Sequence, residues 1–318
     1  MATMAFPVNP TLAAIAIGYK NRDIDLVADR VMPRVPVAQR FAYTTYALAD
    51  AYTVPATRVG RKSEPTQIDF GGTRVEAETV DWGLDDIVPN AEIEAWEAMQ
   101  KPAGHTGPME KSVSLLTSLV QLDREIRVAN LTFATASYAA GQFVTLSGTS
   151  QWSDFVNSNP LDALLVAMDV PVFRPNMVVM GQSVWTKVRQ HPRLIQAANA
   201  SAQTGGAITR QQLADLLEIP VENVIVGAGF VNTARRGQTP NIQRIWGKSC
   251  ALMFSSPDAA NADAPTWGWT AQFGDRVAGD MPEPKMGLRG SVRVRAGESV
   301  LEVVTAPAVG YLFSAAVA

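Results

Sequence analysis

A stripe of apolar residues between positions 108 and 140 is the clearest pattern along the chain. It starts at Leu115 and repeats at alternating spacings of four and three residues, the period of one helix face. Pro108 suits the first turn of such a helix, and Gly141 suits its end. The pattern predicts one helix over 108–140, roughly 50 Å long at 1.5 Å per residue. The members of the stripe are Leu115, Leu119, Leu122, Ile126, Ala129, Phe133, Ala136 and Ala140.

Residues 41–90 show a strand-like pattern on either side of a polar segment. Phe41, Tyr43 and Thr45 alternate with small or polar residues, and a second extended run starts at Thr66. The polar tip between these runs covers 58–65. A two-stranded ribbon is marginally stable in water, so we expect this hairpin-like excursion to rest on its own core or on a neighbouring subunit.

The first forty residues have the pattern of an arm. Prolines bracket one short helical stretch in which Ile24, Val27 and Val31 share a face, and Pro33 ends it. This is too little apolar surface to fold alone. By contrast, 160–280 alternates helical and strand patterns, which predicts a mixed α/β domain, and 291–304 has the pattern of a hairpin.

Composition narrows the class of protein. The chain has 318 residues, a formal charge of −3, 18% charged and 47% hydrophobic residues, which predicts about two globular domains and argues against long disorder or a globally basic nucleic-acid binder. Cys250 is the only cysteine, and there are two histidines, so an intramolecular disulfide and a multi-thiolate metal site are excluded. We see no signal or membrane-spanning pattern and expect a soluble cytosolic protein without a membrane partner.

The small net charge hides blocks of opposite sign. Residues 1–74 carry nine basic and six acidic side chains, 75–110 carry one basic and nine acidic, and 181–250 carry eight basic and three acidic. Such blocks suit head-to-tail contact between copies of one chain, although a solvated acidic face would give the same pattern. The candidate contacts between subunits are Arg58, Arg61, Lys62, Glu64, Glu76, Glu78, Asp81, Asp85 and Asp86.

A search for catalytic motifs finds one partial match. Ser183 lies between a predicted strand and a predicted helix, as the serine of a nucleophile elbow does, but Trp185 replaces the second glycine. His191 lies too far along the same helix to contact Ser183, which better fits a helix N-cap. A serine hydrolase using Ser183 is therefore an alternative only. We predict that the protein is not an enzyme and has no catalytic, cofactor-binding or metal-binding residues.

Several strings of residues carry a family resemblance through their number and order. The arm, the extended excursion, the long helix, the mixed domain and the closing hairpin follow one another in the order found in the major capsid protein of tailed bacteriophages, the Hong Kong ninety-seven fold, which the chain resembles over nearly its whole length. The strings are Asn9-Pro10-Thr11-Leu12 through Gly18-Tyr19-Lys20-Asn21, Met32-Pro33-Arg34-Val35-Pro36-Val37, Pro175-Asn176-Met177-Val178-Val179-Met180-Gly181, Val188-Arg189-Gln190-His191-Pro192, Ile245-Trp246-Gly247-Lys248, and Gly287-Leu288-Arg289-Gly290 with Ala306-Pro307 and Gly310-Tyr311.

The resemblance implies an α+β phage major capsid fold with defined parts. These are an N-terminal arm at 1–40, an extended β-hairpin loop at 41–90, a peripheral domain at 91–159 and 281–318 holding the spine helix 108–140, and an axial domain at 160–280.

The resemblance also implies a function. Copies would assemble into pentamers and hexamers of an icosahedral shell that encloses double-stranded DNA without sequence-specific binding, in a virion capsid assembled in the host bacterial cytoplasm. The expected partners are a separate scaffolding protein, a portal and possible cement protein, with no cofactor. We expect noncovalent closure, although Lys62 lies near the loop tip where some members cross-link. A subunit of an encapsulin-like compartment is the alternative within the same fold.

Overall fold

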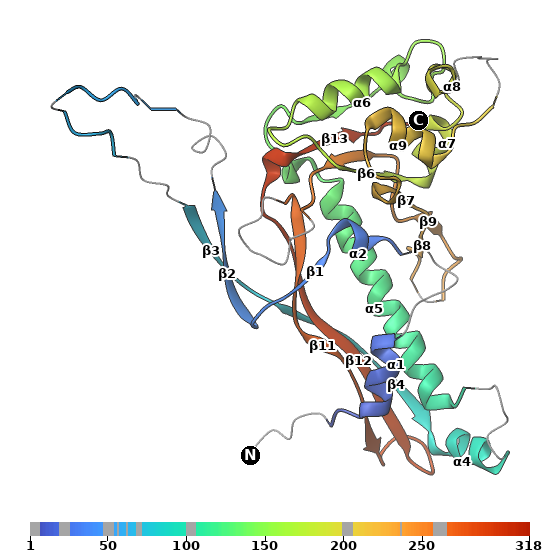
Figure 1. Ribbon diagram of the computed structural model, residues 1–318. Coiled ribbons are helices and arrows are strands. Elements are labelled where there is room, and N and C mark those ends of the chain that lie inside the picture. The colour runs from blue at the N-terminus through green and yellow to red at the C-terminus, as the bar shows by residue number, and fades with distance from the viewer. Residues whose placement is uncertain are drawn as a thin grey trace.

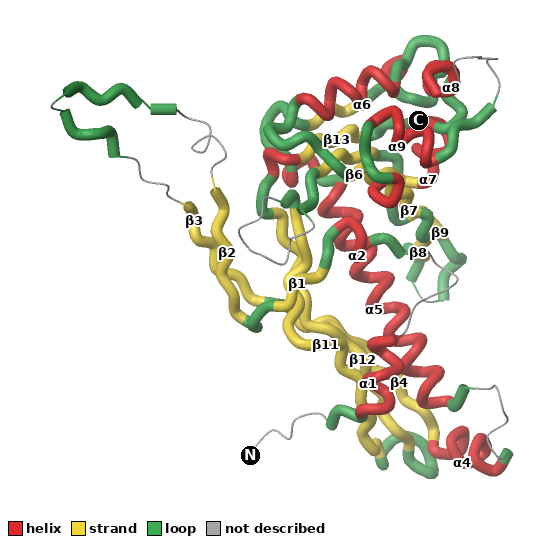
Figure 2. Tube along the Cα trace, viewed as in Figure 1, coloured by secondary structure: helices red, strands yellow, loops and turns green. Residues whose placement is uncertain are grey.

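The long helix α5 (Pro108–Thr132) forms the axis of the molecule. The computed structural model describes residues 7–18, 26–46, 54–55, 57–61, 63–67, 72–99, 106–198, 206–235, 237–256 and 266–318. Figure 1 shows α5 running beside a long, twisted sheet, with a second sheet and its helices at the C-terminal end of α5 and a narrow ribbon projecting to one side. Figure 2 shows the same arrangement by secondary structure.

The long sheet has four strands in the order β1-β11-β12-β4. The hairpin of β11 (Gly268–Glu283) and β12 (Ser291–Val304) is its centre, with β4 (Val80–Pro89) antiparallel to β12 and β1 (Arg34–Pro36) parallel to β11. The predicted hairpin within 291–304 is wrong, because this segment is one strand that pairs with β11 and β4 along its length. Helices α5 and α1 (Pro10–Gly18) pack on this sheet. The apolar core between them contains Leu12, Ala16, Val88, Val113, Leu116, Ala278, Val294 and Ala296.

The second sheet has five strands in the order β5-β13-β10-β6-β7. Strand β6 (Met177–Gly181) is buried throughout, and its residues point alternately into two cores: Val178 packs under the helices, and Val179 faces α5 and Trp246. A sheet covered on both faces explains why its strands are continuous apolar runs. The other strands are β5 (Phe143–Thr145), β13 (Gly310–Ser314), β10 (Cys250–Met253) and β7 (Val224–Gly227), and the helices are α6 (Pro160–Asp169), α7 (Gln182–Val188), α8 (Pro192–Ala198) and α9 (Arg210–Leu217).

The remaining elements are short or lie at the periphery. They are α2 (Ala28–Val31), α4 (Asn90–Ala98), the strand pair β2 (Arg40–Tyr46) and β3 (Gly72–Glu78), the strand pair β8 (Phe230–Asn232) and β9 (Ile242–Arg244), and 3-10 turns at Thr135–Ser137, Gly148–Ser150, Val221–Asn223 and Pro307–Val309.

The predicted helix over 108–140 is wrong at its C-terminal end. Helix α5 stops at Thr132, because the chain turns back and its own side chains satisfy the last carbonyl groups: the Ser137 hydroxyl donates to the Leu131 carbonyl at 2.7 Å, and the Tyr138 hydroxyl donates to the Thr132 carbonyl at 2.7 Å. The turn also lets the Tyr138 ring stack on Trp267, with ring centroids 5.5 Å apart.

The predicted apolar stripe does not face the core along most of its length. Leu115 is 56% exposed and Leu119 is 50% exposed, whereas Val113, Leu116 and Val120 are buried against the sheet. The helix therefore has apolar residues on two faces. The face whose apolar residues repeat more regularly, with Leu115 and Leu119, points away from the sheet.

Strand pairing also places two segments differently from the predicted domains. Strands β5 and β13, which belong to the predicted peripheral segments 91–159 and 281–318, lie in the five-stranded sheet with strands from 160–280. Both form its edge beyond β10: β13 pairs with β10, and β5 pairs with β13. Strand β4, within the predicted loop 41–90, belongs to the four-stranded sheet. The division into peripheral and axial domains itself stays a prediction.

Candidate functional site

The ribbon of β2 and β3 projects to one side of the molecule (Figure 1). The two strands pair antiparallel from Arg40 opposite Glu78 to Tyr46 opposite Gly72. Directly opposed residues share a face, so Phe41 and Tyr43 form an apolar face with Ala77 and Val75. The root of this face packs on the body of the chain: the rings of Phe41 and Tyr43 lie 5.8 and 6.2 Å from the Trp269 ring.

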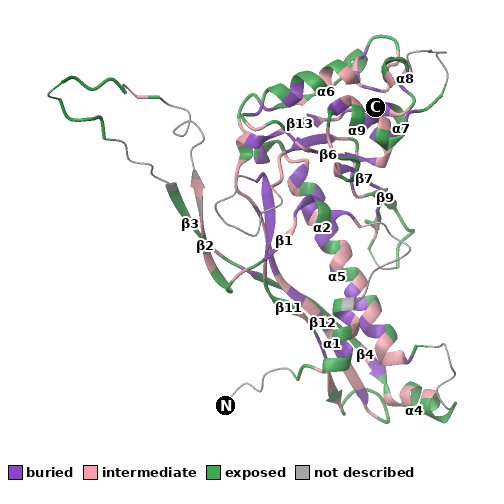
Figure 3. Ribbon diagram, viewed as in Figure 1, coloured by how far each residue is buried: buried purple, intermediate pink, exposed green. Residues whose placement is uncertain are grey.

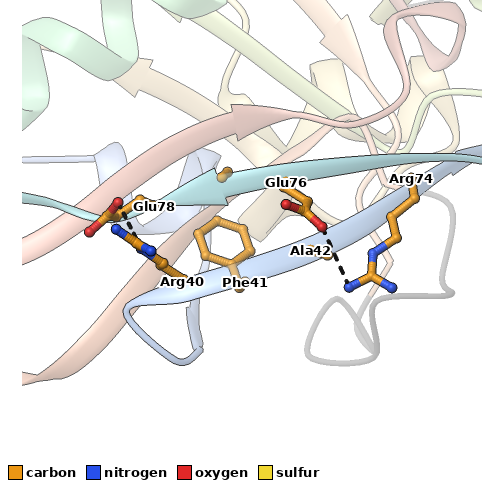
Figure 4. A pocket seen from close by; sticks show the side chains of 7 residues that line it. Arg40, Phe41, Ala42, Arg74, Glu76 and Glu78 are labelled. Carbon is orange, nitrogen blue, oxygen red and sulfur yellow. Dashed lines mark hydrogen bonds and ion pairs between the residues drawn. The ribbon is translucent and has the colours of Figure 1, made fainter.

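The opposite face of the ribbon is charged and slightly hollowed (Figure 4). Arg40 lies 3.2 Å from Glu78, Arg74 lies 3.8 Å from Glu76, and Ala42 lies between the two pairs. Glu76 and Glu78, two of the predicted subunit contacts, therefore have partners on the ribbon itself. Exposed ion pairs of this kind contribute about 0 to 1 kcal/mol, so they leave these side chains able to change partners.

The tip of the excursion carries the predicted basic contacts. Arg58, Arg61 and Glu64 are exposed, and within the described part of the chain they have no hydrogen bond or ion pair. The Ser63 amide donates to the Gly60 carbonyl at 3.0 Å, which forms a turn at the tip. Lys62 lies outside the described residues. Figure 3 shows the tip exposed and distant from the buried sheets.

The predicted contacts on β4 have partners in their own chain. Asp85 accepts two hydrogen bonds from Arg295, at 2.6 and 2.7 Å, and lies 3.5 Å from Arg293. The hydrogen bonds from Arg295 lower the pKa of Asp85. Asp81 accepts from the Ser299 hydroxyl, and Asp86 accepts from the Ser112 hydroxyl at 2.6 Å. These carboxylates tie β4 to β12 and α5, and their role between subunits stays a prediction.

A partly buried charge network, which no pattern in the sequence indicated, holds the arm against the body. Arg34 lies 2.7 Å from Asp29 and 2.8 Å from Glu298, and Arg276 lies 3.3 Å from Glu298. Arg124 of α5 lies 2.5 Å from Asp29 and donates to the Met32 carbonyl at 3.2 Å. Burial alone would raise the pKa of Asp29 and of Glu298, but the surrounding arginines lower both.

Glu125, the next residue on α5, joins three parts of the chain. Its carboxylate accepts hydrogen bonds from the amides of Val27 and Ala28, at 2.9 and 2.8 Å, and from the Trp246 indole at 2.6 Å. Glu125 and Trp246 are each 0% exposed. Burial raises the pKa of Glu125 despite these donors. The adjacent charges Arg124-Glu125 within an inward-facing helix segment were the one sequence signal that could have revealed this site.

Two glycines, Gly181 and Gly227, make room for Trp246. Gly181 and Gly227 are partners at the ends of the parallel strands β6 and β7. A Cβ at Gly181 would lie 1.9 Å from the Trp246 carbonyl oxygen, and one at Gly227 would lie 2.1 Å from the indole ring. Both glycines therefore have a packing role, and neither marks a ligand site.

The structure places Ser183 away from both a base and a helix-capping position. Its hydroxyl donates to the Gly247 carbonyl at 2.9 Å, and the predicted N-cap role is wrong because α7 starts at Gln182 with Gly181 as its N-cap residue. The His191 ring nitrogen Nε2 lies 3.1 Å from the Ser158 hydroxyl, and both residues are buried. Nothing in this geometry supports the hydrolase alternative.

Among the described residues, no three His, Cys, Asp or Glu side chains gather in a way that could hold a metal ion. No helix in those ranges combines the length and the apolar composition needed to cross a membrane. The features that stand out are the projecting ribbon and the buried groups that fix its root and the arm.

Comparison with known proteins assigns the fold. No protein-family model matches the chain. A phage-related protein of known structure from Bordetella bronchiseptica superposes with a TM-score of 0.72 at 22% identity, covering 98% of both chains. The capsid protein of cyanophage P-SCSP1u superposes with a TM-score of 0.58 at 10% identity, covering 99% of this chain and 92% of the other. The fold is thus that of phage capsid proteins, the Hong Kong ninety-seven class.

Comparison of sequences assigns the family. The chain is 43% identical over 319 residues to the major capsid protein of Pseudomonas phage JBD67, covering all of both chains. It is 26% identical over 258 residues to that of Burkholderia phage BcepMu, covering 78% of this chain and 76% of the relative. The chain belongs to the family of major capsid proteins of tailed bacteriophages, which confirms the resemblance and favours it over an encapsulin compartment.

Proposed function

We propose that copies of this protein assemble into pentamers and hexamers that close an icosahedral shell around double-stranded DNA. The observation that carries the proposal is the ribbon, whose strands β2 and β3 pair only with each other among the described strands, and whose tip residues Arg58 and Arg61 are exposed. Because an isolated two-stranded sheet is marginally stable, a neighbouring subunit is the natural support for it. The role is structural and involves no catalysis.

Exposed apolar surface supports the same proposal. Leu115 and Leu119 on α5 are at least half exposed, and Val166 and Val172 on or next to α6 are 59% and 50% exposed. Apolar surface in contiguous patches is uncommon on a soluble monomer and marks interaction sites. We assign these exposed side chains to contacts with neighbouring subunits or other shell components.

Charge supplies the orientation of the contacts in this proposal. The tip cations Arg58 and Arg61, with Lys62, would meet the acidic stretch between Glu76 and Glu97 of a neighbour. The tip points away from the acidic helix α4 of its own chain (Figure 1). Complementary charges at such contacts set register and exclude wrong pairings more than they add affinity.

Further partners complete the proposal. A separate scaffolding protein would guide assembly in the host bacterial cytoplasm, a portal would occupy one vertex, and a cement protein would strengthen the outer surface. The predicted arm, loop, peripheral and axial parts would each keep their place in every subunit, and closure would be noncovalent. The DNA would be enclosed without sequence-specific contacts.

Electron microscopy of the purified full-length protein, alone and with the scaffolding protein, tests this function. We expect capsomers or closed shells. A protein that remains monomeric under both conditions would contradict the proposal. Particles from infected cells should contain genomic DNA, whereas an encapsulin would contain a protein cargo. A covalent ladder on a denaturing gel of purified particles would contradict noncovalent closure.

A further inference from the structure

We propose that Glu125 is a positioning residue that couples the seating of the arm to the docking of the five-stranded sheet, so that neither can be released without loosening the other. This goes beyond the proposed function, because it concerns coupling within one subunit. The coupling would pass through a single carboxylate, which accepts hydrogen bonds from both segments.

The contacts of Glu125 come from places far apart in the sequence. The amides of Val27 and Ala28 start the short helix α2 in the arm, and Trp246 lies in the turn between β9 and β10. Val27 and Trp246 share one carboxylate oxygen, Oε1, while Ala28 uses Oε2. The first amides of a helix have no partner within the helix, so Glu125 supplies the acceptor that α2 itself lacks.

The burial of this cluster makes its members interdependent. Val27, Ala28, Glu125 and Trp246 are each at most 3% exposed. A buried carboxylate that loses a donor is left with part of its charge uncompensated. Release of the arm would open Glu125 to water, which would compete with the Trp246 indole for the carboxylate, and release of Trp246 would let water compete with the amides of Val27 and Ala28. The coupling is equal in both directions.

Trp246 can report on the five-stranded sheet because it is fixed to it. Gly181 and Gly227, at the ends of β6 and β7, leave the space that the Trp246 backbone and ring occupy. The ring of Phe133, just after α5, packs edge-on against Trp246 with centroids 5.6 Å apart. A change at the indole is therefore transmitted to the sheet on one side and to α5 on the other.

Amide hydrogen exchange of full-length subunits carrying Trp246→Phe tests the coupling. The substitution keeps most of the ring and removes the indole N–H. We expect exchange at residues 27 and 28 to rise about tenfold, since a hydrogen bond to a charged group is worth roughly that factor or more. A residue that merely filled space at position 246 would leave those distant amides unchanged.

Trp267→Phe is the matched control. Trp267 is also buried, at 1% exposed, and belongs to the same core cluster, but its indole N–H has no partner among the described residues. Exchange at residues 27 and 28 should stay within about twofold of the native rate, as expected for a substitution outside the hydrogen-bonded group. Equal effects of the two variants, or no effect of Trp246→Phe, would overturn the proposal.

The reverse experiment keeps the test independent of how well the core variants fold. Asp29→Asn, at a carboxylate that is 58% exposed, weakens the arm through Arg34 and Arg124. By reciprocity, exchange of the Trp246 indole N–H should become faster while that of Trp267 does not. An unchanged Trp246 indole in this variant would also overturn the coupling.

Discussion

The guanidinium of Arg34 lies 2.8 Å from the carboxylate of Glu298, although the two residues are 264 positions apart. The Glu298 side chain is 1% exposed, and Arg276 lies on it at 3.3 Å. This pair attaches the start of β1 to the central strand β12, next to the point where the chain leaves the body to form the ribbon. The position of the ribbon root therefore depends on a buried charge.

Substitution Glu298→Gln should destabilise the subunit by about 1–3 kcal/mol, because Arg34 and Arg276, which are 18% and 16% exposed, lose their shared buried carboxylate while Arg34 keeps Asp29. Chemical denaturation of the full-length subunit measures this. The exposed pair Glu94 and Arg289, at 3.1 Å, is the control. Glu94→Gln should cost less than about 1 kcal/mol, and similar losses at the two sites would show that the buried pair has no special role.

Glu298 also predicts a dependence of stability on pH. Burial opposes its ionisation, but Arg34 and Arg276 outweigh burial and lower its pKa below the usual 4.5. Its contribution is therefore complete above the unfolded-state pKa and is lost as pH falls through the lower folded-state pKa. Unfolding free energies measured from pH 7 down to acid should fall less steeply in Glu298→Gln than in the native protein.

Gly227→Ala should cost about 1–3 kcal/mol or more, because the added methyl group would lie 2.1 Å from the Trp246 ring and the packed core must shift to admit it. Gly83→Ala is the control, since its Cβ would meet nothing closer than 3.4 Å. Denaturation midpoints compare the two. An unchanged denaturation midpoint in Gly227→Ala would show that the packing around Trp246 is looser than the structure indicates.

The two apolar faces of α5 predict opposite effects for neighbouring leucines. Leu116 is 7% exposed, and Leu116→Ala should cost about 2–5 kcal/mol of subunit stability. Leu119 is 50% exposed, and Leu119→Ala should change stability by less than about 1 kcal/mol while reducing the yield of shells. Normal assembly of Leu119→Ala would remove the outer stripe from the proposed contacts.

The double substitution Arg58→Glu with Arg61→Glu should suppress assembly and leave subunit stability within about 0.5 kcal/mol, since both side chains are exposed.

Native shells should loosen as salt rises, because exposed charges are screened beyond roughly 8 Å at physiological ionic strength. Light scattering across a salt series measures both effects. The charge-conserving double variant, Arg58→Lys with Arg61→Lys, should assemble normally. Shells whose stability does not change with salt would show that apolar contacts, and not these charges, hold the subunits together.

Local patterns were sufficient to predict most elements. The alternation of Phe41 and Tyr43 predicted a strand, and Pro108 marked the start of the long helix, because strand and helix periods are properties of short segments. They were insufficient at the end of α5, where Ser137 and Tyr138 cap the helix from beyond it. Tertiary contacts decide such boundaries.

The sequence by itself determined the order of elements, the family resemblance and the scarcity of catalytic motifs. Tertiary structure alone decided that Leu116 rather than Leu115 faces the core, that Gly181 and Gly227 accommodate Trp246, and that Glu125 joins residues about a hundred positions away. The physical reason is that periodicity identifies an apolar face without identifying its partner. Burial and pairing between distant segments depend on how the sheets pack against α5.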